Sequence, residues 1–127
     1  MTVSKLFDLH THSTASDGRL SPMELWQRAQ ANGVDYMALT DHDTLAGVWQ
    51  LQRHLAEKNA ALDSGLQTQL VPGVEITALI DNLCVHVVGL WLDSDNDPLN
   101  AFLNSQQQVR DTRGQHIAAE LEKAGIA

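Results

Sequence analysis

Two histidines one residue apart follow the first apolar segment of the chain. Residues 3–9 predict a short buried strand that runs into the sequence Asp8-Leu9-His10-Thr11-His12. Residues two apart in an extended chain point to the same side, so Asp8, His10 and His12 are expected to share one face. Paired imidazoles at a strand end commonly bind a divalent metal, but an isolated His-x-His is equally often a pair of surface histidines.

A second apolar segment, residues 34–39, also leads to a histidine next to carboxylates. Asp41 and Asp43 flank His42, and such acids can orient the ring and raise its basicity as a ligand. Asp43 or Thr44 is alternatively the cap of the next helix. Only His42 of this segment is therefore assigned to the metal ligands.

Three further residues could complete such a site. Asp17 lies between Ser16 and Gly18, where it is otherwise an ordinary turn residue. Glu75 interrupts an apolar segment, and a carboxylate there must be exposed, ion-paired or bound to a metal. His86 lies in the middle of the most apolar segment of the chain, where a hydrogen-bonded core histidine is the alternative.

These candidates are all histidines and carboxylates, without a thiolate. Such a set suits Zn, Mn or Fe in a site with open positions, rather than a closed structural zinc site. The candidates are too many for one ion, which favours a cluster of metals bridged by Glu75. Two metals about 3.5–4 Å apart can activate a water and hold both oxygens of a displacement at phosphorus. Because no phosphate-binding glycine loop, serine triad motif or reactive cysteine motif is present, the predicted chemistry is metal-assisted hydrolysis.

Alternating strands and helices must position these residues. Ser21, Pro22 and Glu24 predict a capping box at the start of one helix. The predicted order is strand, helix, strand, helix, two or three strands and a helix, at residues 3–9, 21–33, 34–39, 45–62, 69–91 and 97–125. A break in the third strand is expected at Pro72-Gly73. This alternation is typical of an α/β protein with a largely parallel sheet or barrel, in which functional groups collect at the carboxyl ends of the strands.

Length and composition limit the possible classes of protein. With 127 residues, 43% of them hydrophobic, the chain is an ordinary globular sequence of one domain at most. A net charge of -8 argues against a surface that coats nucleic acid, although bound cations can still allow a nucleotide substrate. The single cysteine, Cys84, excludes an internal disulfide and suits a reducing compartment. Neither a signal peptide nor a membrane-spanning run is recognisable, so we expect a cytoplasmic protein without a membrane partner.

Five motifs, in order along the chain, resemble those of the PHP (polymerase and histidinol phosphatase) superfamily. They are Asp8-Leu9-His10-Thr11-His12-Ser13, Ser16-Asp17-Gly18, Thr40-Asp41-His42-Asp43-Thr44, Pro72-Gly73-Val74-Glu75 and Val85-His86-Val87-Val88-Gly89-Leu90. The likeness is greatest to the branch of 3',5'-nucleoside bisphosphate phosphatases and a 5'-3' exoribonuclease. The resemblance implies part of a distorted (β/α)7 barrel, with mostly parallel strands and flanking helices, and two or three divalent metals (Mn, Zn or Fe).

The resemblance also implies roles for individual residues. The implied metal ligands are His10, His12, Asp17, His42, Glu75 and His86. Among them, His10, His12 and Glu75 are expected to take part in catalysis, while Asp8 and Asp41 support the ligands without touching the metals. Arg110 and Arg113 lie three apart on one helical face, which is ordinarily just solvated, and they match a position where the branch places phosphate-contacting arginines.

The chain differs from the family pattern in its length. Family members are about twice as long, judged against the usual size of a complete barrel. Residues 1–127 are therefore expected to be the amino-terminal portion of a single metal-dependent phosphoesterase domain, without the later His and the late Asp-x-His that finish the cluster. A half barrel exposes sheet edges and apolar surface, so we expect it to form a homo-oligomer or to associate with the missing half. Activity is expected of the complete protein rather than of this portion.

Three kinds of function remain open. The first is a metal-dependent phosphoesterase that acts on 3',5'-bisphosphorylated nucleotides or trims short RNA from its 5' end, with histidinol phosphate as the alternative substrate. The second is an amidohydrolase, which also begins with His-x-His but often needs a bridging lysine carbamate, for which Lys5, Lys58 and Lys123 are poorly placed. The third is a non-catalytic metal-binding scaffold, which an incomplete ligand set would favour.

Overall fold

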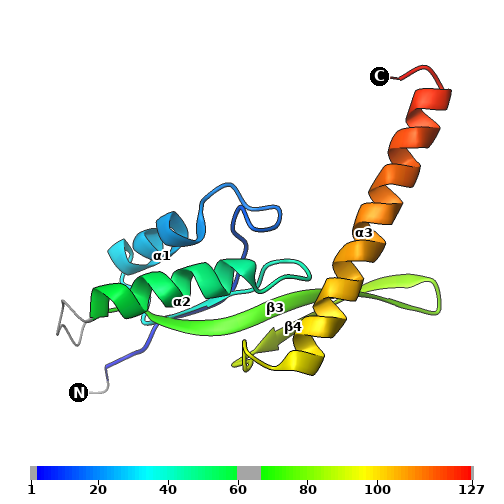
Figure 1. Cartoon of the computed structure of the whole chain (residues 1–127). Coiled ribbons are helices and arrows are strands. Elements are labelled where there is room, and N and C mark those ends of the chain that lie inside the picture. The colour runs from blue at the N-terminus through cyan, green and yellow to red at the C-terminus, as the bar shows by residue number, and fades with distance from the viewer. Residues whose placement is uncertain (1–2, 60–66, 127) are drawn as a thin grey trace. The chain divides into compact units, whose positions relative to one another are not determined.

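A computed structural model describes residues 3–59 and 67–126 of the chain. It contains two compact units, Met1–Asp95 and Asn96–Ala127. The first unit has strands and helices in the order β1 (Phe7–Thr11), α1 (Pro22–Ala31), β2 (Tyr36–Leu39), α2 (Ala46–Asn59), β3 (Gln69–Ile80) and β4 (Leu83–Leu90), as Figure 1 shows. The second unit consists of one helix, α3 (Asp97–Lys123).

The four strands form one sheet in the order β1-β2-β3-β4. β1, β2 and β3 run parallel, and β4 pairs with β3 in the opposite direction. Asp81 and Asn82 both have positive φ angles, 49° and 66°, and form the two-residue turn of the β3–β4 hairpin. The fold is therefore the expected mixed α/β part of a barrel with mostly parallel strands, and its last strand is antiparallel.

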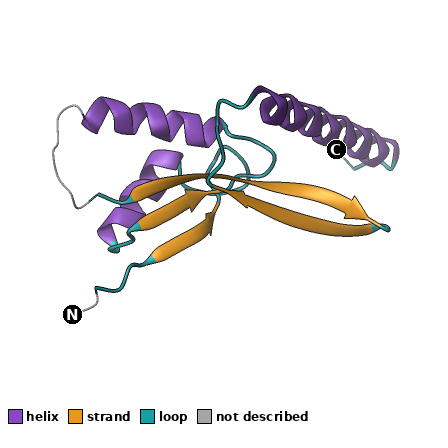
Figure 2. Ribbon diagram, turned by 90° about the horizontal axis from the view of Figure 1, so that it is seen from below, coloured by secondary structure: helices purple, strands orange, loops and turns teal. Residues whose placement is uncertain are grey.

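Helices α1 and α2 pack against each other, and against β2 and β3 respectively (Figure 2). Each parallel connection passes through a helix, and right-handed crossovers between successive strands place both helices on the same face. The core between helices and sheet is centred on Trp26, Met37 and Leu51, all 5% exposed or less. Burial of such side chains contributes about 1.5–3 kcal/mol each, which holds the strands that carry the site.

The predicted first helix is confirmed in detail. Ser21 is the N-cap, its side chain accepts a hydrogen bond from the Glu24 N–H, and the Glu24 carboxylate accepts one from the Ser21 N–H. Gly33 follows the C-cap with a φ of +73°, a conformation that side chains other than glycine rarely adopt. The second predicted helix extends to residue 62, and its residues 60–62 lie outside the described part of the chain.

The predicted break at Pro72-Gly73 is wrong, because β3 continues through both residues. Pro72 is the last residue paired with β2, opposite Leu39, and the antiparallel ladder with β4 begins one residue later, at Gly73 opposite Leu90. A proline lacks the N–H that a ladder uses, and it is tolerated at this junction between the two pairings. The uninterrupted strand carries Glu75 beyond the end of the parallel ladder.

In the second unit, hydrogen bonds cap both ends of helix α3. The Asn96 side chain accepts a hydrogen bond from the Leu99 N–H at 2.9 Å at the start of α3. At the other end, Gly125 has a φ of +78°, and the Ile126 N–H donates to the Leu121 carbonyl at 2.9 Å. Gly114 does not interrupt the helix. Among the described residues, no helix combines the length and apolar character needed to cross a membrane.

Candidate metal centre

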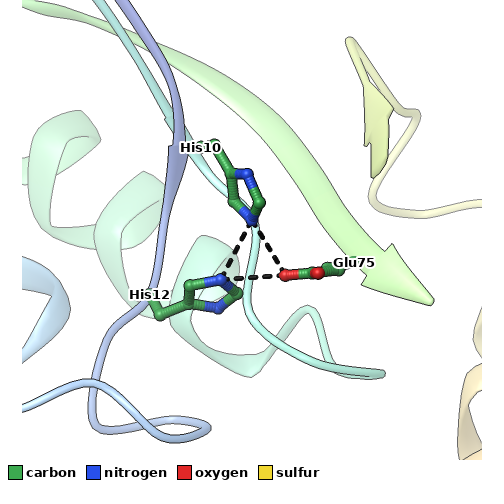
Figure 3. A group of neighbouring side chains, drawn as sticks. All are labelled: His10, His12 and Glu75. Atoms are coloured by element: carbon green, nitrogen blue, oxygen red, sulfur yellow. Dashed lines mark hydrogen bonds and ion pairs between the residues drawn. The ribbon is translucent and has the colours of Figure 1, made fainter. Parts of the chain in front are cut away.

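Three side chains converge at the end of the parallel sheet, as Figure 3 shows for His10, His12 and Glu75. The Glu75 Oε2 atom lies 2.9 Å from His10 Nε2 and 2.8 Å from His12 Nε2. The two imidazole nitrogens are 3.1 Å apart. His10 lies near the end of β1 and His12 directly follows the strand, on the same side, as the two-residue periodicity predicts, whereas Glu75 comes from β3, on the far side of β2.

The segment after β2 extends the parallel ladder and fixes Glu75. The Glu75 N–H donates to the Asp41 carbonyl at 3.1 Å, and the Asp43 N–H donates to the Glu75 carbonyl at 3.0 Å. His42 and Glu75 thereby form an isolated parallel bridge. Asp43 has a positive φ of 52° at this point, which turns the chain out of the ladder. The Glu75 backbone is thus fixed through both its N–H and its carbonyl group, and the side chain is only 7% exposed.

A second group joins His12, Asp17 and His42. Asp17 Oδ2 lies 3.2 Å from His42 Nε2, and Asp17 Oδ1 lies 3.7 Å from His12 Nδ1. The rings of His12 and His42 are stacked, with centroids 4.5 Å apart and 15° between their planes. Asp17 is therefore placed against two histidines, which a simple turn residue would not require.

A third group joins His42, Glu75 and His86. His86 lies on β4 directly opposite Thr77 of β3, so that its side chain shares a sheet face with Glu75. His86 Nδ1 is 3.5 Å from Glu75 Oε1 and 3.3 Å from the Thr77 hydroxyl. The side chain is 48% exposed, so the alternative of a buried core histidine is wrong.

The donor atoms of these groups fit a divalent cation. In each group, one ligand atom per residue can be chosen so that all lie within 4.8 Å of one another. The buried Nδ1 atoms of His12 and His42 lack a hydrogen-bond partner in the described part of the chain, although buried polar atoms are normally satisfied. Imidazole nitrogens and carboxylate oxygens without a thiolate suit Zn, Mn or Fe. All six residues that the resemblance implies as ligands occur in the three groups.

The electrostatics of Glu75 agree with this arrangement. Burial raises the pKa of the Glu75 carboxyl, but the hydrogen bond with His10 and the charges of His42, His10 and His12 outweigh it and hold the pKa below its ordinary value. The carboxyl is therefore ionised at neutral pH and available as an anionic ligand. Glu75 belongs to two of the three groups, as do His12 and His42, and it is the only carboxylate among these shared residues.

Asp8 and Asp41, expected to support the ligands, differ in their surroundings. Asp8 is exposed on β1, in the parallel pairing with Met37 of β2. Asp41 is buried, and its carboxylate accepts hydrogen bonds from Ser13 and Ser16, in the loop that follows β1. The sequence suggested a bond to the neighbouring ring instead, and nothing in the spacing indicated the two serines.

The remaining predicted residues lie elsewhere. Arg110 and Arg113 are both exposed and lie three residues apart on α3, in the second unit. The lysines considered for an amidohydrolase are engaged or distant in sequence from the ligands: Lys5 lies 3.7 Å from Asp35, Lys123 lies 3.0 Å from Glu120, and Lys58 is in the last turn of α2. The carboxylate that two of the three groups have in common comes from Glu75, and not from a lysine carbamate.

Comparisons with known proteins agree with this geometry. The model of the PHP domain family matches residues 8–119. A 5'-3' exoribonuclease of Haemophilus influenzae is 44% identical over 98% of this chain and 42% of its own length. A 3',5'-nucleoside bisphosphate phosphatase of Chromobacterium violaceum is 40% identical over 94% of this chain and 39% of its own. The chain thus spans about two fifths of the length of these curated relatives.

One solved structure extends the comparison to the fold. A protein of Bifidobacterium adolescentis assigned as a metal-dependent phosphoesterase superimposes with a TM-score of 0.77 and 26% sequence identity. The match covers 95% of this chain and 40% of that one. It is consistent with a chain that forms part of a larger barrel.

Proposed function

Because this chain belongs to the PHP domain family, we propose that the protein is a metal-dependent phosphoesterase acting on nucleotides. Its substrates are 3',5'-bisphosphorylated nucleotides or the 5' end of short RNA, as the names of its relatives indicate for those proteins. The observation that carries the proposal is the convergence of His10, His12 and Glu75, with heavy-atom separations of 2.8–3.1 Å. The lone cysteine and the substrate class both suit the cytoplasm.

The proposed cofactors are two or three Mn, Zn or Fe ions held by the three groups of ligands. Bound divalent cations supply Lewis acidity that activates water and stabilises negative charge at phosphorus. The residues of the chain hold and orient these cations. Glu75 links two groups, His12 links two, and His42 links two, so that removal of one shared ligand disturbs more than one position.

We further propose that residues outside this chain complete the centre, either from the remainder of a longer polypeptide or from a second copy. The curated relatives are more than twice as long as the matched region. Apolar side chains on the β3–β4 hairpin support a covered surface, since Leu79 is 75% and Leu83 is 69% exposed. Residues 1–127 would then be the amino-terminal portion of one phosphoesterase domain. Arg110 and Arg113 are proposed to contact a substrate phosphate through charge-assisted hydrogen bonds.

The proposed function is tested by phosphate release from adenosine 3',5'-bisphosphate after the protein is loaded with Mn, Zn or Fe. Parallel reactions contain a 5'-phosphorylated RNA oligonucleotide or histidinol phosphate, which separate the nucleotide phosphatase, the exoribonuclease and the histidinol phosphatase. His10→Ala should abolish the release, and His116→Ala, on the exposed surface of α3, is the matched control. A metal-loaded protein in which the residues that complete the centre are also present, and which releases nothing from any of the three substrates, would remove the proposed activity.

A further inference from the structure

One buried carboxylate next to the metal centre belongs to none of its three groups. Asp41 is 1% exposed. Its Oδ1 atom accepts hydrogen bonds from the Ser13 N–H at 2.6 Å and the Ser16 hydroxyl at 2.7 Å, and its Oδ2 atom accepts one from the Ser13 hydroxyl at 2.7 Å. Hydrogen bonds to a charged acceptor are short and about twice as strong as neutral ones. Both oxygens of Asp41 are therefore bonded to the loop after β1.

This loop, residues 12–18, is folded around Ser13. The Ser16 and Gly18 N–H groups both donate to the Ser13 carbonyl, at 3.0 Å and 2.9 Å. At Gly18 the loop comes back so close to its first residue that a Cβ atom there would lie 2.1 Å from the His12 carbonyl oxygen. By binding the N–H and the hydroxyl of Ser13, Asp41 fixes the residue around which the loop closes.

The same loop presents Asp17 to the centre. Asp17 follows Ser16 directly, and its carboxylate lies 3.2 Å from His42 Nε2. Its side chain is 68% exposed, so little packing of its own holds it there. The position of Asp17 must come from its backbone, which is anchored on one side by the Ser16 hydroxyl and on the other by Gly18. Asp41 supplies the first of these anchors.

The start of α2 confines the Asp41 carboxylate. A Cβ atom on Gly47 would lie 2.7 Å from Asp41 Oδ2 and 3.1 Å from the Ser13 hydroxyl oxygen. The carboxylate therefore lies closely packed between the first turn of α2 and the loop. This confinement gives the loop one defined geometry relative to β2 and His42.

We propose that Asp41 is a positioning residue that sets the affinity of the His12–Asp17–His42 group for a divalent cation. It acts through Ser13 and Ser16 on Asp17, and not on the ring of His42. The proposal rests on the proposed metal-dependent function and adds to it a division of labour, since the Asp41 side chain positions Asp17, which belongs to this group alone. Replacement of a residue that supports a metal ligand typically lowers metal affinity 10–100-fold.

The first test measures the loop without any metal. Amide hydrogen exchange of the chain is followed in chelator for the wild type and Asp41→Asn, with Ser16→Ala as a milder second variant. The matched control is Thr14→Ala, an exposed residue in the same loop whose side chain does not bond to Asp41. Faster exchange at Ser16 and Gly18 is expected in the first two variants and not in the control. Unchanged exchange in both would overturn the proposal and leave the proposed function untouched.

The second test locates the effect by a double-mutant cycle on Mn²⁺ affinity, measured by calorimetry. Asp41→Asn is expected to weaken binding by about 10–100-fold. In an Asp17→Ala background the same change should alter the remaining affinity by no more than about 2-fold, because two residues that act through one another are not additive. In a His10→Ala background the loss should persist. A merely structural role of Asp41 would weaken binding in both backgrounds, which would overturn the assignment.

Failure of the two proposals can be told apart. A wild type that binds no Mn²⁺ removes the proposed metal-dependent function, and the role of Asp41 with it. A wild type that binds Mn²⁺, and does so equally well after Asp41→Asn, removes only the role of Asp41.

Discussion

Glu75→Gln should remove cations from two of the three groups while the third retains its own. The substitution keeps the size of the side chain and exchanges one carboxylate oxygen for an amide nitrogen, which donates hydrogen bonds and cannot act as a ligand. Glu75 belongs to the His10–His12–Glu75 and His42–Glu75–His86 groups, whereas His12–Asp17–His42 does not contain it. The expected result is a fall to at most one tightly bound cation per chain.

The size of the effect follows from the position of the carboxylate. A residue that only supports a metal ligand changes affinity 10–100-fold. Glu75 Oε2 lies 2.8 Å and 2.9 Å from the nitrogens of His12 and His10, which places it among the ligand atoms themselves. We therefore expect a loss of at least about 100-fold at both groups, or about 2.8 kcal/mol at 1.4 kcal/mol per factor of ten.

The assay is Mn²⁺ titration monitored by electron paramagnetic resonance, in which the free ion is counted directly. Glu57→Gln is the matched control, because Glu57 is exposed on α2 and belongs to none of the three groups. Asp17→Ala provides the complementary loss, since it removes the group that Glu75→Gln leaves. Equal titration curves for the wild type and Glu75→Gln would refute the shared role of Glu75.

Three further predictions concern stability. Gly47→Ala, which within a helix usually gains about 0.5–1 kcal/mol, should instead lower the free energy of unfolding, because its Cβ would press on Asp41 Oδ2; urea denaturation of the two proteins gives the sign. Ser21→Ala should destabilise the chain by about 1 kcal/mol, measured in the same way, because it removes the cap of α1. In chelator, the free energy of unfolding of the wild type should exceed that of Glu75→Gln at neutral pH, and the difference should shrink as the pH falls through the lowered pKa of Glu75. The reason is that a carboxyl with a depressed pKa in the folded state stabilises the fold only while it is ionised. A difference that grows toward low pH would contradict the assignment.

Much of the fold could be predicted from local signals in the sequence. The capping box at Ser21 and Glu24 located the start of α1, and the order of elements followed from alternating apolar segments and polar turns. The polar pair Asp81-Asn82 between two apolar segments indicates a turn, and a two-residue turn can join only antiparallel strands, so the direction of β4 could be predicted from the sequence. The continuity of β3 through Pro72 was not, because it depends on where two ladders exchange partners.

The candidate site, too, could be predicted only in part from the sequence. Two-residue periodicity placed His10 and His12 on one face, and the unusual carboxylate in an apolar segment identified Glu75. The serines that bind Asp41 were not identified, because Ser13 and Ser16 are ordinary loop residues whose role arises only when β1 and β2 lie side by side. Long-range hydrogen bonds of this kind leave no periodicity in the sequence.

Metal content per chain tests the central claim most directly. The protein is purified without chelator, its folded fraction is isolated by gel filtration, and Mn, Zn and Fe are counted by plasma mass spectrometry against protein concentration. We predict two or more of these ions per chain, held by the three groups that share His12, His42 and Glu75. Less than one ion per chain in a folded sample, unchanged after incubation with Mn²⁺ or Zn²⁺, would contradict the assignment of these residues as a metal centre.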